Sequence, residues 1–312
     1  MKKPAKLNKG DLVGVIAPAS PPKTEPLQKA LRFLEEELGL IVKIGNSVDK
    51  KYGYLAGEDS DRIEDIHRMF EDQDVKAIFC ACGGFGTGRI VSKLNFELIR
   101  QNPKIFWGYS DITFLHTAIH QQTGLVTFHG PMLSSDIGLS DVHNASKDSF
   151  QQLFHTEDIV YTYEKSKLET VVEGVANGPV IGGNLTLLVS TLGTPFEVNT
   201  KGKLLFIEDI DEEPYKVDRM VNQLKMANKF NEASGIIIGD FKNCVPEKPE
   251  RSLTLDEVLM EHIASAGKPV LKGFHIGHSS PSIAIPVGSI GKLDTRDHTF
   301  TIETGVRGGG NE

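Results

Sequence analysis

The chain has 312 residues, of which 39% are hydrophobic and 24% charged, and a formal net charge of −8. These proportions are typical of a globular protein, and a chain of this length has room for about two domains. The 34 Lys and Arg residues are spread along the chain, and no apolar stretch is long enough for a membrane span or a signal sequence. Composition therefore argues against nucleic acid and membranes as partners and favours a cytoplasmic protein.

Strands and helices alternate over the first half of the chain. Leucines recur every three or four residues from Leu27 to Leu38, which is the spacing of an amphipathic helix. The expected elements are, in chain order, a strand at 12–17, a helix at 24–38, a strand at 41–44, a helix at 63–70, strands at 75–81 and 104–109, and a helix at 111–121. Such alternation predicts an α/β fold, with a parallel sheet covered by helices.

The second half is richer in polar and short β-like segments. Its expected elements are strands at 170–175 and 204–207, a helix at 215–228, a strand at 236–238, a helix at 255–266, and strands at 270–276, 283–287 and 299–302. We expect the last two strands to pair as a hairpin. This change in composition and in the expected elements predicts two domains, at residues 1–165 and 166–312.

Ser110 follows the expected strand at 104–109 and precedes the helix at 111–121. A serine at such a turn projects its hydroxyl above the edge of the sheet, and the amides at the helix start face any developing oxyanion. The hydrolase elbow motif requires a glycine two residues after the serine, where Ile112 stands, so the motif is only half matched. Ser110 is therefore a candidate nucleophile, with helix capping as the alternative.

A glycine-rich loop at 82–89 follows the strand at 75–81. It fails the dinucleotide-binding fingerprint because Arg89 stands where the third glycine is required, and it lacks the Gly-Lys-Ser/Thr of a phosphate loop. Loops at the carboxyl ends of strands bind ligands in open α/β sheets, and exposed amides in this loop can supply oxyanion donors. The alternative is a purely structural turn.

Two further candidates lie in the second half of the chain. A cluster of carboxylates at 208–213 follows the strand at 204–207, and Glu208 is the one nearest the sheet. A cation site, a solvated turn and a carboxylate that orients a catalytic histidine all remain open. His278 lies in a loop at a strand end and is a candidate general base, with an exposed structural histidine as the alternative.

A rival site is the pair His116 and His120, which share one helix face and could bind zinc. The glutamate that a zinc-peptidase helix carries after its first histidine is replaced by Thr117, so we expect no metal. The cysteines form neither a disulfide framework nor a zinc pattern. The three are Cys80, Cys82 and Cys244, and the apolar run around the first two favours small buried side chains, with a reactive thiol as the alternative.

Taken together, several segments resemble the LD-carboxypeptidase family of serine peptidases, also called muramoyltetrapeptide carboxypeptidases. They occur in the family's order and cover nearly the whole chain, and the resemblance is greatest to the Bacillus-type enzymes of murein-peptide recycling. The segments are 82–89, Gly108-Tyr109-Ser110-Asp111, Phe128-His129-Gly130-Pro131-Met132, Gly182-Gly183-Asn184-Leu185, 205–215 with Asp218-Arg219, and Gly277-His278. A joint match of this kind is more specific than any single motif.

The resemblance implies an N-terminal flavodoxin-like domain that carries the nucleophile Ser110 and a smaller C-terminal β-rich domain that carries the triad members Glu208 and His278. It implies an oxyanion hole made by the amide of Asp111 and by one amide of the segment 83–85, for which we take Gly84. It also implies that the active site is assembled between the two domains, that no cofactor is needed, and that the enzyme is a homodimer.

The implied reaction is release of the terminal D-alanine from a murein tetrapeptide in cell-wall peptide recycling. Gly83, Phe85 and Arg89 are candidate substrate-binding residues, with Arg89 as a bidentate partner of the terminal carboxylate. The alternative for Arg89 is a bond to loop carbonyls. Two other functions remain open: an immunity-type peptidase that hydrolyses a peptidyl-nucleotide antibiotic of the microcin C7 kind, and a non-catalytic murein-peptide-binding protein. The chain's one tryptophan, Trp107, is expected to be buried, which argues against base stacking on it.

Overall fold

A computed structural model describes residues 1–162 and 166–309, which fall into two compact units. Unit 1 comprises Met1–Glu157, Ser280–Gly288 and the C-terminal segment from Thr304, and unit 2 comprises Asp158–Ser279 and Ser289–Glu303. The units are thus discontinuous in sequence, whereas the predicted domains 1–165 and 166–312 are continuous. The predicted boundary adjoins residues 163–165, which lie outside the described residues.

The sheet of unit 1 has the strand order β12-β5-β4-β3-β1-β2. Strands β1 to β5 are parallel, and β12 runs antiparallel to β5. Parallel strands in the order 2-1-3-4-5 define the flavodoxin-like arrangement, so the predicted fold class is confirmed. The strands are β1 (Leu12–Ile16), β2 (Ile41–Ile44), β3 (Val75–Cys80), β4 (Ile105–Gly108), β5 (Thr127–His129) and β12 (Ile285–Val287).

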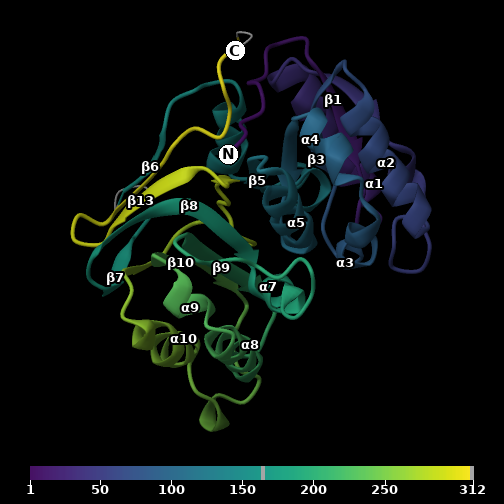
Figure 1. Cartoon of the computed structure of the whole chain (residues 1–312). Coiled ribbons are helices and arrows are strands. Elements are labelled where there is room, and N and C mark those ends of the chain that lie inside the picture. The colour runs from purple at the N-terminus through teal and green to yellow at the C-terminus, as the bar shows by residue number, and fades with distance from the viewer. Residues whose placement is uncertain (163–165, 310–312) are drawn as a thin grey trace. The chain divides into compact units, whose positions relative to one another are not determined.

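Helices cover both faces of this sheet (Figure 1). Because side chains alternate along a strand, Phe79 and Trp107 join one core with the α1 side, while Phe106 stacks on Phe70 of α2 on the other face. The helices and short turns are α1 (Thr24–Arg32), η1 (Phe33–Glu37), η2 (Asn46–Asp49), α2 (Asp59–Glu71), α3 (Thr87–Ile90), η3 (Val91–Lys93), α4 (Phe96–Gln101), η4 (Ser110–Ile112), α5 (Thr113–Thr123), η5 (Leu133–Ile137), α6 (Asn144–Asp148) and η6 (Ser149–Leu153).

The hairpin predicted between 283–287 and 299–302 is wrong. The strand at Ile285–Val287, β12, pairs with β5 of unit 1, while β14 (Thr299–Ile302) pairs with β13 (Ile290–Asp294) of unit 2. The strand β13 has the weak pattern Ile-Gly-Lys-Leu-Asp, which gave no strand signal in the sequence. With no signal for β13, the two more apolar segments are consecutive strands in the sequence, and this is why a hairpin between them is expected.

Unit 2 contains an eight-stranded mixed sheet in the order β6-β14-β13-β8-β9-β10-β11-β7. Only the central strands β8 to β11 are parallel, so the unit is a β-rich α/β structure, as predicted. Its strands not yet defined are β6 (Ile159–Tyr161), β7 (Glu169–Val172), β8 (Val175–Asn184), β9 (Leu204–Ile210), β10 (Gly235–Lys242) and β11 (Val270–Lys272).

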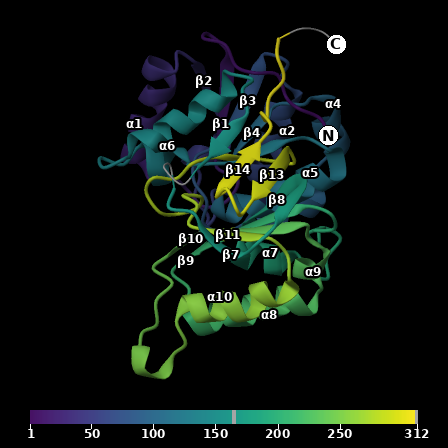
Figure 2. The same cartoon turned by 90° about the vertical axis from the view of Figure 1, so that its left-hand side faces the viewer.

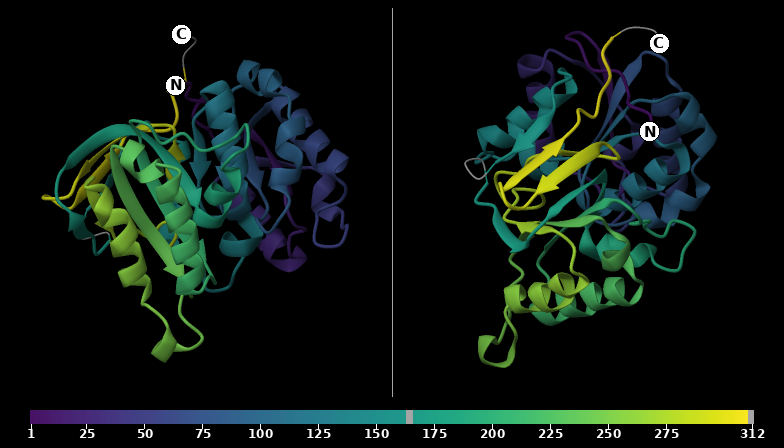
Figure 3. Two further views of the ribbon diagram at one scale, coloured as in Figure 1. Left: turned by 60° about the horizontal axis from the view of Figure 1, so that its bottom comes forward. Right: turned by 60° about the vertical axis from the view of Figure 1, so that its left-hand side comes forward.

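Two helices of unit 2, α8 and α10, lie side by side against its parallel strands (Figures 2 and 3). Their apolar faces and the strands form one buried cluster, which includes Val217, Leu259 and Ile236. The helices and turns of the unit are α7 (Leu185–Thr191), α8 (Pro214–Met226), α9 (Lys229–Glu232), η7 (Pro249–Arg251), α10 (Leu255–Ile263) and η8 (Ala264–Ala266). Among the described residues, no helix combines the length and apolar character needed to cross a membrane.

Candidate active site

Ser110 lies directly after β4, at the turn that leads through η4 into α5. Its φ is 63°, a left-handed conformation that costs a serine free energy and that nucleophiles at strand-to-helix turns adopt. The next residue, Asp111, is buried, and its Oδ2 accepts a hydrogen bond of 2.8 Å from the Thr87 N–H. The Thr87 hydroxyl donates to the Asp111 carbonyl at 2.6 Å. The serine turn is therefore tied to the end of the glycine loop.

The glycine loop approaches Ser110 at Gly83. A Cβ at this position would lie 2.9 Å from the Ser110 Cβ and 3.1 Å from its Oγ, so only a glycine allows the backbone to come this close. Ser20 holds the loop here, because its N–H donates to the Gly83 carbonyl at 3.1 Å and its Oγ accepts from the Phe85 N–H at 3.1 Å. The predicted residues Gly83, Phe85 and Ser110 therefore lie in one small region of unit 1.

Burial raises the pKa of the Asp111 carboxyl, and its bonds to Thr87 oppose that shift. The N–H groups of Gly84 and Asp111 donate to no protein acceptor within the described ranges 1–162 and 166–309. The Phe85 N–H, in contrast, is already bonded to Ser20. Of the three loop amides considered in the sequence, that of Phe85 is thus the least able to bind an oxyanion.

Arg62 is a functional candidate that the sequence reasoning missed. It is fully buried, and its guanidinium donates to the carbonyls of Pro18 and Gly86 at 2.9 and 3.0 Å and to Asp59 at 2.5 Å. The arginine that donates to a carbonyl of the glycine loop, that of Gly86, is therefore Arg62 and not Arg89. Arg62 lies four residues before Ile66, on the helix face predicted to be buried, and this spacing was the available signal.

Arg89 is 46% exposed, and its Nε donates to Asp59 at 3.0 Å. The ion pair with Asp59 raises the pKa of the guanidinium. A guanidinium has five N–H donors, so this contact leaves capacity for a second carboxylate. The structure thus places Arg89 at the exposed end of the glycine loop with one acidic partner already bound.

In unit 2, Glu208 lies on β9 and is fully buried. Its Oε2 accepts a hydrogen bond of 2.7 Å from Nδ1 of His278, whose side chain is 12% exposed. Because Nδ1 carries the proton in this bond, Nε2 of the neutral ring is left as the basic nitrogen. Burial raises the pKa of Glu208, and the adjacent His278 opposes the shift. The pair has the arrangement of a general base and the carboxylate that orients it.

The loop reaches Glu208 because residue 277 is a glycine. Gly277 has φ of 126°, and a Cβ there would lie 2.6 Å from the Glu208 Oε2. The neighbouring carboxylate, Asp209, is held differently, since it accepts bonds from Asn184 at 2.9 Å and from the Thr186 N–H at 3.0 Å. Of the acidic cluster at 208–213, Glu208 is therefore the member that orients a histidine.

Comparison with known proteins places these two groups of residues in one family. The family model described as the LD-carboxypeptidase N-terminal domain matches residues 13–130, and the one described as the LD-carboxypeptidase C-terminal domain matches residues 177–293. The "probable murein peptide carboxypeptidase" of Bacillus subtilis is 62% identical over 98% of this chain and 96% of its own length. The chain belongs to the LD-carboxypeptidase family. It is a hydrolase of the carboxypeptidase type, and by family a serine peptidase.

Solved structures of this family have the same fold. A muramoyltetrapeptide carboxypeptidase from Oxalobacter formigenes matches with a TM-score of 0.84, 26% identity, and coverage of 95% of this chain and 99% of that one. The microcin C7 self-immunity protein MccF, in complex with aspartyl sulfamoyl adenosine, matches with a TM-score of 0.89 and 26% identity over 97% of this chain and 98% of that one. The LD-carboxypeptidase fold therefore occurs in proteins with different named functions.

The rival histidine pair is engaged with the backbone. His116 is fully buried, its Nε2 donates to the Gly108 carbonyl at 2.7 Å, and burial lowers its pKa to about 4. The His120 Nδ1 lies 3.1 Å from the Leu125 carbonyl. In the part of the chain that the structure describes, no three His, Cys, Asp or Glu side chains are grouped to hold a metal ion.

The cysteines are not activated thiols. Cys80 and Cys244 are buried, and burial raises the pKa of the partly buried Cys82 to about 12. The Cys82 thiol donates to the Ser20 carbonyl at 3.1 Å, so it is part of the packing around the glycine loop. Cys80 and Cys244 are thus buried as interpreted, while Cys82 is only partly buried.

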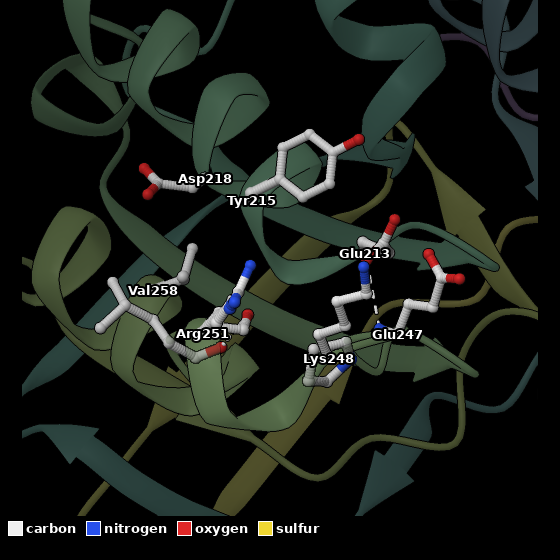
Figure 4. A pocket seen from close by; sticks show the side chains of 10 residues that line it. Glu213, Tyr215, Asp218, Glu247, Lys248, Arg251 and Val258 are labelled. Carbon is white, nitrogen blue, oxygen red and sulfur yellow. Dashed lines mark hydrogen bonds between the residues drawn. The ribbon is translucent and has the colours of Figure 1, made fainter.

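Unit 2 also has a surface cavity of about 400 Å³ beside the start of α8 (Figure 4). Its walls come from α8, the segment 246–253 and α10, and the Glu247 N–H donates to the Glu213 carboxylate at 3.2 Å. Tyr215 and Lys248 are among the side chains that line it (Figure 4). None of the predicted site residues lines this cavity.

Proposed function

We propose that this chain is a serine LD-carboxypeptidase that releases the terminal D-alanine from murein tetrapeptides. It would cleave the bond between the L-centre of the diamino acid and D-alanine. The name of the Bacillus subtilis relative, at 62% identity over 98% of this chain, supports the murein-peptide substrate. The chemistry rests on the 2.7 Å bond between His278 and Glu208, because it leaves His278 Nε2 as a base.

In this mechanism, the Ser110 Oγ attacks the scissile carbonyl carbon while Nε2 of His278 takes the hydroxyl proton. The mechanism requires these two atoms to come within hydrogen-bond reach in the working enzyme. His278 then gives the proton to the D-alanine nitrogen as the C–N bond breaks. Water, deprotonated by His278, hydrolyses the acyl-enzyme and restores Ser110. Glu208 holds the imidazole orientation throughout and stabilises the imidazolium.

For the oxyanion hole we propose the N–H groups of Asp111 and Gly84. Both lie in unit 1 and have no acceptor among the residues that the structure describes, whereas the Phe85 N–H is bonded to Ser20. Preorganised amides of this kind stabilise the tetrahedral intermediate more than the ground-state carbonyl, and each contributes roughly 3 kcal/mol. The bond between Asp111 and Thr87 keeps the two donors in one local structure.

For substrate binding we propose Gly83, Phe85 and Arg89. Gly83 leaves room for the substrate backbone beside Ser110, and the Phe85 ring is 53% exposed. Arg89 would bind the terminal carboxylate with the donors that Asp59 does not use. No cofactor is needed in this mechanism, because every proton transfer uses a side chain of the protein.

The deciding experiment is mass spectrometry of L-Ala-γ-D-Glu-meso-diaminopimelate-D-Ala after incubation with the native protein. Loss of D-alanine with the native protein but not with Ser110→Ala supports the proposal. Equal loss with both proteins would remove the serine mechanism. No loss with either, together with tight binding of the peptide, would favour a non-catalytic binding protein.

An immunity-type peptidase is the second candidate, because MccF has the same fold and was solved with aspartyl sulfamoyl adenosine. Trp107 is fully buried, so it cannot stack on a nucleobase, but Tyr54 and Phe85 form an exposed edge-to-face pair with ring centroids 5.4 Å apart. Comparing kcat/KM on the tetrapeptide and on a sulfamoyl adenosine substrate separates the two functions. A higher value for the nucleotide would replace the murein proposal.

We also propose that the protein is a cytoplasmic homodimer, as the family resemblance implies. Light scattering coupled to gel filtration measures the oligomeric state, and a mass of one chain, 34.2 kDa, would contradict the homodimer. Fractionation of the source cells measures the location, and recovery of the protein outside the cytoplasmic fraction would contradict it.

A further inference from the structure

Strand β10 carries a third titratable side chain, Asp240, beside the Glu208–His278 pair. The pairing of β10 with β9 is interrupted between Ile238 and Phe241, so Gly239 and Asp240 leave the regular ladder. The Asp240 N–H donates instead to the Ile276 carbonyl at 2.9 Å, two residues before His278. Asp240 is therefore bonded to the same loop that positions the histidine.

The backbone of this bulge also lies against Glu208. A Cβ on Gly239 would stand 3.3 Å from the Glu208 Cβ and 2.6 Å from the Ile276 carbonyl oxygen. A side chain at 239 would thus push the strand away from Glu208 and from the loop that carries His278. Gly239 brings Asp240 close to Glu208 and to the loop at the same point.

The Asp240 carboxyl is only partly satisfied. Its Oδ2 is buried and has no hydrogen-bond partner among the described residues. Burial, followed by the negative charge of Glu208, raises its pKa to about 7, while a hydrogen bond from Ser279 and the charge of His278 oppose that shift. A carboxyl with this pKa changes its charge in the pH range where a histidine base also changes its own.

Four polar or charged groups act on Asp240, and a fifth, Asp209, acts on Glu208 beside it. Glu208 and Asp209 lie on β9, His278 and Ser279 lie in the loop after Ile276, and Lys242 lies on β10 itself. The histidine is the group among them whose protonation the proposed reaction uses. A role for Asp240 limited to holding the loop would need the carboxyl's shape and hydrogen bond, but not its charge.

We propose that Asp240 is a positioning residue that acts through its charge on the Glu208–His278 pair and sets how readily His278 accepts a proton. This rests on the proposed function only in calling His278 the base. An ionised Asp240 adds a negative charge that stabilises the imidazolium, so His278 holds its proton to higher pH. A protonated Asp240 removes that effect. The two groups then titrate as a coupled pair, with two steps that belong to both.

The test is an NMR titration of the His278 ring in the full-length protein, with the signal assigned by its loss in His278→Gln. Asp240→Asn keeps the shape and removes the charge. We expect its His278 transition to become a single step, displaced to lower pH by about half to one unit. On the acid limb of the profile of kcat/KM against pH, this is a rise of roughly three- to tenfold at fixed pH. Asp297→Asn, in the exposed turn between β13 and β14, is the matched control and should change neither quantity.

An unshifted His278 transition in a folded Asp240→Asn protein would overturn the inference. Should that variant fail to fold, Ser279→Ala provides the second test, because loss of its hydroxyl raises the Asp240 pKa further. Asp240 then stays protonated to higher pH, so the midpoint of the His278 transition should move to lower pH, as in Asp240→Asn, and an unmoved midpoint counts against the inference. The NMR titration needs no turnover, so failure of D-alanine release in the native protein would remove the proposed function without deciding this result.

Discussion

Gly277→Ala tests whether catalysis requires the close approach of the His278 loop to Glu208. The new Cβ would lie 2.6 Å from Oε2, about half an ångström inside the closest ordinary contact. Glu208 is fully buried in the sheet, so the loop must move, and His278 moves with it. Displacements of this order at a catalytic group cost up to about 100-fold in rate. We therefore expect kcat/KM for D-alanine release to fall by about 30- to 100-fold, mainly through kcat.

The φ of 126° at Gly277 is a second cost, because an alanine there is strained by about 1–3 kcal/mol. Gly267→Ala is the matched control, since Gly267 also has a positive φ, of 63°, but nothing lies within 4 Å of a Cβ placed there. This control should lower the unfolding midpoint slightly and leave kcat/KM unchanged. The reasoning is refuted if Gly277→Ala keeps kcat/KM within twofold of the native protein while both variants fold.

Four other substitutions test separate parts of the mechanism. Ser110→Ala should lower kcat for D-alanine release by about 10⁶ with an unchanged circular dichroism spectrum, and a loss below about 100-fold would contradict its role as nucleophile. Glu208→Gln should lower kcat by about 10³ to 10⁴ with a smaller change in KM, because the amide cannot hold the same tautomer of His278; a loss below tenfold would exclude an orienting role. Arg89→Ala should raise KM for the tetrapeptide about tenfold or more, and an unchanged kcat/KM would remove Arg89 from carboxylate binding. Burial lowers the pKa of His116 to about 4, so the unfolded chain binds a proton at this residue before the folded protein does as the pH falls from 6.5 to 4. Denaturant titrations should therefore show that the free energy of unfolding decreases by up to about 3 kcal/mol over that pH range. The same decrease in His116→Gln would show that another group causes it.

The alternation of strands and helices in unit 1 was predictable because each element has its own periodic signal. The apolar run before Ser110 and the repeating leucines after Thr24 depend only on neighbouring residues. The strand order depends instead on contacts between distant segments. The return of β12 to β5 shows this, since Ile285–Val287 is as apolar as β14, and only tertiary packing selects its partner.

The candidate site was predictable to different degrees in the two units. Ser110 could be singled out from a local turn, and its positive φ agrees with that interpretation. The pairing of Glu208 with His278 joins residues 70 positions apart, so no local pattern contains it, and only the family resemblance suggested it. Arg62 and Asp240 were missed because a charged residue in a helix or a strand is ordinarily solvated, and burial shows only in the folded chain.

In each unit, a glycine allows the backbone to lie directly against a side chain of the proposed triad. Gly83 does this at Ser110, and Gly277 does it at Glu208. The supporting bonds are also internal to each unit, from Thr87 to Asp111 in unit 1 and from His278 to Glu208 in unit 2. Substitutions in one unit should therefore leave the local geometry of the other unchanged. For that reason Ser110→Ala should leave the hydrogen bond between His278 and Glu208 in place, whereas Gly277→Ala should disturb it.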